Sequence, residues 1–274
     1  MSNLVKSAAR VIDILELLAD VTEGMTLSEL CIALLIPASS MHALVNTLIA
    51  KGYLLKDEAS QRYLLGPKLP QITAIFNSHL DLTSIADPYM RHLVEITGES
   101  TFVTRLDRDK ITILKVHPGL GVIRIFNMVG SHLPAHATGS GKAQLAYLTE
   151  AEVDQIYPNE NLPAILPATI KTKTELKQAL HLIREAGYAL DEEEAEAGVW
   201  AMASCIRDGS GRPMASLSIS APSFRVRREV IGEWAKVLVQ SALSISERFG
   251  FNTRSGIPHT TTGLPSHQIG ATVK

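Results

Sequence analysis

The segment spanning residues 26–66 constrains the fold of this chain more than any other stretch. Thr26 and Glu29 have the spacing of a capping box, which satisfies two free N–H groups at the start of a helix. Pro37 has no N–H to lose, so it can open a second helix after a tight turn. Gly52 suits the end of that helix, and two short apolar runs separated by polar residues follow it. The pattern predicts a winged helix-turn-helix, with a third helix upstream over residues 5–19.

The second of these helices has an apolar stripe and, opposite to it, a face of small polar side chains. A helix of this kind can enter a major groove and hydrogen-bond base edges, although an ordinary helical hairpin with a solvated face has the same spacing. The hairpin favours the first interpretation because a wing places basic residues near phosphates. The candidate DNA-contacting residues are Ser39, Ser40, His42, Ala43 and Asn46 on the helix, with Lys56 and Arg62 on the wing.

Composition sets the general class of the protein. The chain has 274 residues, of which 46% are hydrophobic and 20% charged, enough for two globular domains. It shows neither an apolar run of about 20 residues nor a secretory leader, so we expect a soluble, cytoplasmic protein without membrane contact. Two cysteines in apolar settings, Cys31 and Cys205, suit a reducing compartment. The net charge of −2, with six basic and seven acidic residues in the first 70, does not itself indicate nucleic-acid binding.

The remainder of the chain mixes helical and strand patterns. Hairpin turns such as residues 208–211 indicate an antiparallel sheet, and therefore an α+β domain. We expect a helical region over 68–97 with a break near Asp87 and Pro88, and a polar disordered tail over 252–274. The other expected helices are 140–148, 150–157, 173–187 and 226–249, and the expected strands are 101–107, 111–116, 122–126, 188–194, 199–206 and 213–220.

Two segments of this second part carry polar groups suited to a ligand. Gly139, Ser140 and the glycine after them sit at a helix start, where free N–H groups can bind a carboxylate or phosphate. A glycine-softened helix start capped by Thr138 has the same sequence. Along the strand 213–220, Ser218 and Ser220 share one face with Ser216; such a face meets water more often than it lines a cavity. Of the acidic run 191–194, Glu192 and Glu193 are expected to be solvated.

Metal and nucleotide motifs are incomplete. His132 and His136 are four residues apart, but Pro134 between them argues against a helix that presents both. Gly119 and Gly121 begin a dinucleotide-binding pattern that fails at Arg124. We therefore expect no metal and no cofactor.

Taken together, the winged-helix segment, the segment LPAHATGSGKAQLAYL and the segment DEEEAEAGVWAMASCIRDGSGRPMASLSISAP resemble the IclR-type bacterial transcription regulators over about residues 4–250. The resemblance implies a DNA-binding domain over 1–66, a linking helix over 67–81 and a GAF-like effector-binding domain over 82–251. It also implies dimers through the N-terminal region, often paired into tetramers. The effector pocket that it implies comprises Val122, Ile125, Leu133, Gly139, Ser140, Asp191, Ala201, Ser218 and Ser220.

The chain departs from the pattern of this family at three positions. Ala201 stands where many members have Cys or Ser, Cys205 replaces a usual proline, and Ala43 replaces a typical arginine of the recognition helix. The expected function is a non-enzymatic, ligand-responsive repressor of a catabolic operon. Its partners would be a double-stranded DNA operator, a small organic acid and further copies of itself. Two alternatives stay open: a hydrolytic pocket, and a winged helix that contacts protein instead of DNA.

Overall fold

A computed structural model describes residues 4–72 and 81–252 of the chain. It divides into two compact units, Met1–Asp81 and Leu82–Lys274, which are treated separately below. Residues 68–72, near the start of the expected linking helix, are helical. Residues 73–80 lie outside the described residues. The expected tail also lies outside them from residue 253 onward.

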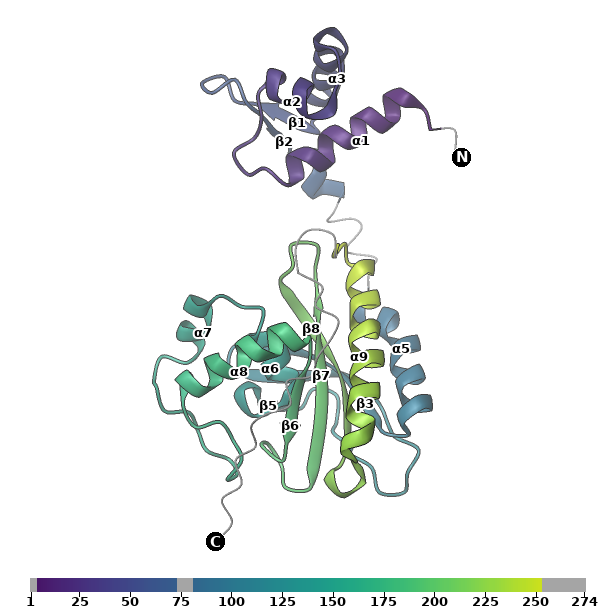
Figure 1. Cartoon of the computed structure of the whole chain (residues 1–274), viewed down its shortest axis with the longest axis vertical. Coiled ribbons are helices and arrows are strands. Elements are labelled where there is room, and N and C mark those ends of the chain that lie inside the picture. The colour runs from purple at the N-terminus through teal and green to yellow at the C-terminus, as the bar shows by residue number, and fades with distance from the viewer. Residues whose placement is uncertain (1–3, 73–80, 253–274) are drawn as a thin grey trace. The chain divides into compact units, whose positions relative to one another are not determined.

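The first unit has the predicted winged helix-turn-helix arrangement (Figure 1). The capping box forms as expected: the Thr26 N–H donates to Oε2 of Glu29 at 2.7 Å, and the Glu29 N–H donates to Oγ1 of Thr26 at 3.3 Å. Leu35 takes the left-handed conformation, with φ of 52°, that turns the chain between the two helices. The elements of this unit are α1 (Lys6–Ala19), α2 (Leu27–Leu34), α3 (Ala38–Ala50), β1 (Leu54–Lys56) and β2 (Tyr63–Leu65).

A small core closes the first unit. It draws one to three side chains from each helix, one from each wing strand and Ile36 from the turn between α2 and α3. Helical periodicity predicts this, since residues spaced by three or four fall on one face. The buried members are Ile14, Leu18, Leu30, Ile36, Met41, Val45, Leu48, Leu54 and Tyr63.

The second unit is built on a six-stranded antiparallel sheet with the order β5-β4-β3-β8-β7-β6. Helices α5 and α9 pack on one face and helices α6 and α8 on the other, as Figure 1 shows. The strands are β3 (Ser100–Asp107), β4 (Lys110–His117), β5 (His132–Pro134), β6 (Ala189–Glu192), β7 (Val199–Arg207) and β8 (Pro213–Pro222). The helices are α5 (Leu82–Thr97), α6 (Gly139–Leu145), α7 (Glu150–Ile156), α8 (Lys173–Ala186) and α9 (Arg228–Arg248), with short 3-10 turns at Ala135–Ala137 and Ser223–Arg225.

Two expected features of this unit are wrong. Residues 122–126 are not a strand, because the outer edge of β4 is already paired with β5 and with the backbone of Gly130 and Ser131. Helix α5 also does not break at Pro88, although proline removes one backbone N–H. The buried side chains Ala86 and Met90 on either side of Pro88 anchor the helix to the sheet, and this packing offsets the lost bond.

Strand alternation separates the two faces of β8. Leu217 and Ile219 belong to the core beneath α5 and α9, so the intervening serines face the α6 side. Ser216, Ser218 and Ser220 are all buried, and the interpretation as a water-facing serine surface is therefore wrong.

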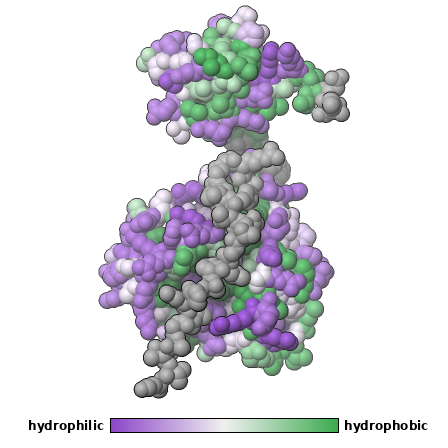
Figure 2. Space-filling view, in the orientation of Figure 1, coloured by the Kyte–Doolittle hydropathy of each residue, from purple (hydrophilic) through white to green (hydrophobic). Residues whose placement is uncertain are grey.

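The surface in Figure 2 is mixed, with hydrophobic groups among hydrophilic ones on both units. Among residues 4–72 and 81–252, no single helix is both long and apolar enough to cross a membrane. Only the pair α2 and α3, bent by 115°, reaches the required length and composition.

Candidate functional site

The outer face of α3 presents the polar side chains expected there. Ser39, His42, Ala43 and Asn46 are exposed and Ser40 is half-buried, whereas the opposite face of the helix lies in the core. The side-chain amide Nδ2 of Asn46 donates to Nδ1 of His42 at 3.0 Å. The contact holds both side chains together on the exposed face of the helix, where each keeps polar atoms for a base edge.

The two basic residues of the wing are placed differently from each other. Nη1 of Arg62 donates to the carbonyl of Gly24 at 2.8 Å and to Oε2 of Glu29 at 3.1 Å. This pairing ties the wing to α2, while 36% of the Arg62 side chain stays exposed, so a phosphate contact by Arg62 stays a prediction. Lys56 lies 3.9 Å from the exposed carboxylate of Glu58, a weak pairing that leaves its ammonium available.

In the second unit, a pocket opens between the sheet and the start of α6. Eight of the nine residues expected to bind the effector line this pocket: Ile125, Leu133, Gly139, Ser140, Asp191, Ala201, Ser218 and Ser220. The ninth, Val122, is 98% exposed and is not part of the wall, although Ile125 of the same loop is. Nine further residues of the lining were not predicted from the sequence: Phe102, Thr104, Ile111, Ile113, Asn127, Thr138, Ala195, Glu196 and Val199.

Some of these missed residues could have been found from the strand pattern. Phe102 and Thr104 alternate on β3, which pairs with β8 so that Phe102 lies opposite Ser218 and Thr104 opposite Ser216. The same face of both strands must therefore line one cavity. Asn127 and Glu196 lie in loops, where no periodicity indicates direction.

The start of α6 combines the two interpretations that its sequence allows. Oγ1 of Thr138 accepts from the Gly141 N–H at 3.1 Å, so Thr138 is the cap. Gly141 is required by close packing, since a Cβ there would lie 2.2 Å from the Ala135 carbonyl oxygen. Gly139 and Ser140, in contrast, lie at the pocket, and a Cβ on Gly139 would meet only ordinary contacts at 3.5 Å or more.

Asp191 is the buried ionisable group of the pocket. Its Oδ1 accepts from the Glu194 N–H at 2.8 Å, and only 3% of the residue is exposed. Burial raises the pKa of Asp191 to about 6, while the backbone bond from Glu194 and the charge of Lys142 oppose this rise. Glu192 and Glu193 are exposed as expected, so the four acids of this run have different environments.

The two histidines considered for a metal are engaged elsewhere. Nδ1 of His132 bonds to the Thr112 hydroxyl at 2.9 Å, and Nε2 of His136 bonds to the carbonyl of Pro163 at 2.9 Å. Within the part of the chain that the structure describes, no group of three or more His, Cys, Asp or Glu residues is arranged to hold a metal ion.

Comparison with known proteins identifies the two units. Residues 7–58 match the model described as the IclR helix-turn-helix domain, and residues 75–247 match the model described as the bacterial transcriptional regulator IclR C-terminal domain. The chain belongs to the IclR family. Both units of this IclR-family protein are therefore accounted for, one as a DNA-binding module and the other as a regulatory domain.

Individual relatives agree with this assignment over nearly the whole chain. The HTH-type transcriptional regulator XynR of Escherichia coli K12 is 30% identical over 249 residues, covering 90% of this chain and 98% of that protein. The transcriptional repressor IclR of the same strain is 29% identical over 248 residues, which are 90% of each chain. The crystal structure of Pseudomonas aeruginosa HmgR superposes with a TM-score of 0.65 at 26% identity, covering 91% of this chain and 100% of that one.

The IclR-family protein described here is thus a ligand-responsive, DNA-binding transcription regulator and not an enzyme. Neither the hydrolytic alternative nor the protein-interaction alternative gains support from its relatives.

Proposed function

We propose that this protein represses a catabolic operon in the cytoplasm and that a small organic acid, bound in the pocket beside α6, relieves the repression. The relatives named as repressors support the direction of regulation. The pocket itself is the observation that carries the proposal of an effector, because it combines hydroxyl and N–H donors with an apolar wall.

The size of the pocket favours a small ligand. Its free volume is about 50 Å³, and a water molecule takes about 10–15 Å³ by the same measure, so it has room for roughly three to five water-sized groups. Ser140, Ser218 and Ser220 offer hydroxyls, and Gly139 and Ser140 lie where their N–H groups can meet a carboxylate. Phe102 and Leu133 supply apolar surface for the body of the acid.

The lining contains no lysine, arginine or histidine, while Asp191 and Glu196 are both acidic. A carboxylate ligand is therefore bound by neutral donors, and it is repelled less when Asp191 carries a proton. This links effector binding to the protonation of Asp191, whose pKa lies near 6.

The proposed homo-oligomer rests on α1. Val5, Ala8, Ile12 and Ala19 are exposed along one side of this helix, with Val5 at 68% and Ile12 at 54% exposure. Positions separated by three, four and seven residues share a helical face, so they form an apolar stripe that a second copy can cover. Two such copies would present two α3 helices to two operator half-sites.

For DNA, the proposed contacts are Ser39, Ser40, His42, Ala43, Asn46 and Lys56, with Arg62 bracing the wing. The experiment is footprinting of the purified protein on its own promoter region, followed by titration of the mapped duplex with a panel of small acids. Repression predicts a protected site and weaker binding when one of the acids is present. Equal affinity for the promoter and a scrambled duplex at physiological salt would overturn the proposal.

A further inference from the structure

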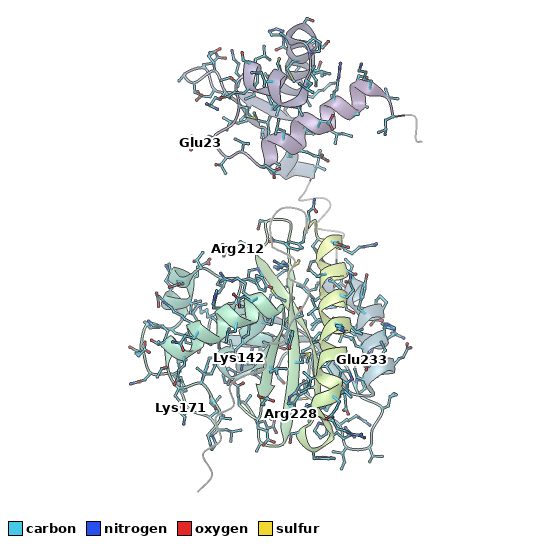
Figure 3. The ribbon with its side chains drawn as sticks, in the orientation of Figure 1. Glu23, Lys142, Lys171, Arg212, Arg228 and Glu233 are labelled. Carbon is cyan, nitrogen blue, oxygen red and sulfur yellow. The ribbon has the colours of Figure 1, made fainter. Side chains whose placement is uncertain are left out.

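A buried ion pair lies next to the effector pocket without being part of its lining. Lys142 on α6 is 4% exposed and Glu194, in the loop after β6, is 9% exposed. Nζ of Lys142 donates to Oε1 of Glu194, and the two residues come from segments 52 positions apart in the chain. Figure 3 labels Lys142 in the second unit, in the region of α6 and α8. Ion pairs this deeply buried are costly to desolvate, so their presence needs a reason other than stability.

The backbone of Glu194 connects this pair to the pocket. Its N–H donates to Oδ1 of Asp191 at 2.8 Å, and its carbonyl accepts from Oγ1 of Thr169 at 2.6 Å. Asp191 lines the pocket, and so do Ala195 and Glu196, the next two residues of the chain. Every polar group of Glu194 except Oε2 is therefore held, in a loop that belongs to no helix or strand.

Isolated backbone bonds close the ends of the loop: the Glu193 N–H donates to the Val199 carbonyl at 3.1 Å, and the Gly198 carbonyl accepts from the Ser223 N–H at 2.9 Å. Residues 193–196 run as bends and residues 197–198 as a turn between β6 and β7, and both ends, Glu193 and Gly198, take positive φ angles of 60° and 77°. No ladder of sheet hydrogen bonds fixes the residues between them. The side chain of Glu194 adds a link from the middle of the loop to Lys142 on α6.

We propose that Lys142 is a positioning residue for effector binding: through Glu194 it holds Asp191 and the wall residues Ala195 and Glu196 in the geometry that the effector meets. This inference rests on the proposed function of the pocket. Lys142 also offsets the negative charge around the pocket, where Asp191, Glu194 and Glu196 are the acidic groups.

Two variants separate the anchor from the charge. Lys142→Met removes the anchor and leaves Glu194 buried without a counter-charge. Lys142→Met combined with Glu194→Gln removes the anchor but keeps the net charge of the site, and neutral replacement of a buried pair is often tolerated by the fold. Lys177→Met is the matched control, because it removes an ammonium from an ion pair with Asp154 elsewhere in the same unit.

The first measurement is calorimetric titration of the full chain with the acid that relieves repression. We expect the double variant to bind it at least about tenfold more weakly, the cost of a lost hydrogen bond or a misplaced wall. Its affinity for the promoter duplex without acid should match that of the wild type and of Lys177→Met. A double variant with the effector affinity of the wild type would overturn the inference.

The second measurement does not depend on the effector, so it tests the inference even if no acid in the panel binds. Amide hydrogen exchange of the ligand-free protein should be faster at residues 193–196 in the double variant, by at least about tenfold, because the loop opens more often. Exchange in α7 should stay unchanged. Unchanged exchange at 193–196 would show that the pair does not hold the loop, whereas faster exchange with no acid binding would contradict the proposed effector alone.

The pH profile tests the charge of Lys142 separately from its role as an anchor. The charge of Lys142 lowers the pKa of Asp191, against the upward effects of burial and of Glu194. In Lys142→Met the pKa of Asp191 should rise, so the pH at which acid binding weakens should move upward. The same profile in Lys142→Met as in the wild type would contradict the proposed contact between Lys142 and this site.

Discussion

Arg62 on the wing donates to Glu29 on α2 across 3.1 Å, joining two elements 33 positions apart in the chain. The guanidinium is therefore a structural link before it is a DNA contact, whereas Lys56 on the paired strand has only a weak partner. The two basic residues of one hairpin should thus respond differently to removal.

The logarithm of DNA affinity falls as the logarithm of salt concentration rises. We predict that Lys56→Ala makes this slope less steep by about 0.9, the value for one lost phosphate contact. Arg62→Ala should change this slope by less and should lower the thermal stability of the first unit instead. Salt titration of promoter binding and thermal unfolding measure the two effects. Equal slopes for both variants would contradict this prediction and would show that Arg62 leaves Glu29 to contact a phosphate when the protein binds DNA.

The pair of Asn46 and His42 should carry sequence discrimination. Their contact at 3.0 Å fixes both side chains on the exposed face of α3. Asn46→Ala should cost about 1–3 kcal/mol of preference for the mapped operator over scrambled duplex, because an amide that reads a base edge is lost. Binding to the scrambled duplex should stay constant, since phosphate contacts remain. Fluorescence anisotropy with both duplexes tests this, with exposed Glu233→Ala on α9 as the control.

Effector affinity should depend on pH through Asp191. Burial raises the pKa of Asp191 to about 6, so the carboxyl is protonated below this value and charged above it. An organic acid should therefore bind more weakly as the pH rises from 5 to 8, by up to about tenfold per pH unit above the pKa. The raised pKa of Asp191 also affects folding. Between its ordinary value of 3.8 and about 6, the folded state binds more protons than the unfolded chain. The contribution of Asp191 to the free energy of unfolding therefore decreases as the pH rises from 3.8 to about 6.

Asp191→Asn provides the test of that assignment. The amide is close to the carboxyl in size and does not titrate, so calorimetric affinities from pH 5 to 8 should become nearly constant. A pH dependence that persists in Asp191→Asn would assign the titration to another group, with Glu196 the next candidate in the lining.

The architecture could be predicted because its signals are local. The capping box at Thr26, the hairpin turn at residues 208–211 and the alternation along β8 each specify a backbone conformation from neighbouring residues alone. The loop at residues 118–131 could not, because its apolar residues satisfy a strand pattern while the sheet edge they would need is taken by β5. Val122 in this loop is exposed and outside the pocket lining, although Ile125 of the same loop is part of it.

The candidate effector site also contains some features that local sequence predicts and others that it does not. Local motif and alternation predicted the helix start at Gly139 and the shared face of Ser216, Ser218 and Ser220, but not that they line one pocket, because the partners that surround them come from distant segments. The link from Lys142 to Glu194 and the burial of Ser218 depend on which strands are adjacent, and an order such as β3-β8-β7 is a property of the whole sheet. Resemblance to a family supplied that long-range information for the pocket, and periodicity alone did not.

The pocket serines give a prediction with an internal control. Ser218→Ala together with Ser220→Ala should weaken effector binding at least about tenfold, since a hydrogen bond to a charged group contributes about 1.5–3 kcal/mol. Ser204 is also buried in the sheet, but it donates to the Gly187 carbonyl at 2.9 Å, away from the pocket. Ser204→Ala should lower stability and leave effector affinity unchanged. Calorimetric titration and chemical denaturation separate the two; equal effector affinity in the wild type and the double variant would remove the serines from the site.

The two glycines that begin α6 should tolerate alanine very differently. A Cβ on Gly141 would lie 2.2 Å from the Ala135 carbonyl oxygen, so Gly141→Ala must displace backbone and should cost about 1–3 kcal/mol or more. A Cβ on Gly139 meets nothing closer than 3.5 Å, and alanine is the better helix former, so Gly139→Ala should fold with near wild-type stability. Chemical denaturation of both variants gives the comparison. If Gly139→Ala proved as destabilising as Gly141→Ala, the start of α6 would pack more tightly against β6 and β7 than these distances allow, leaving less room for an acid beside it.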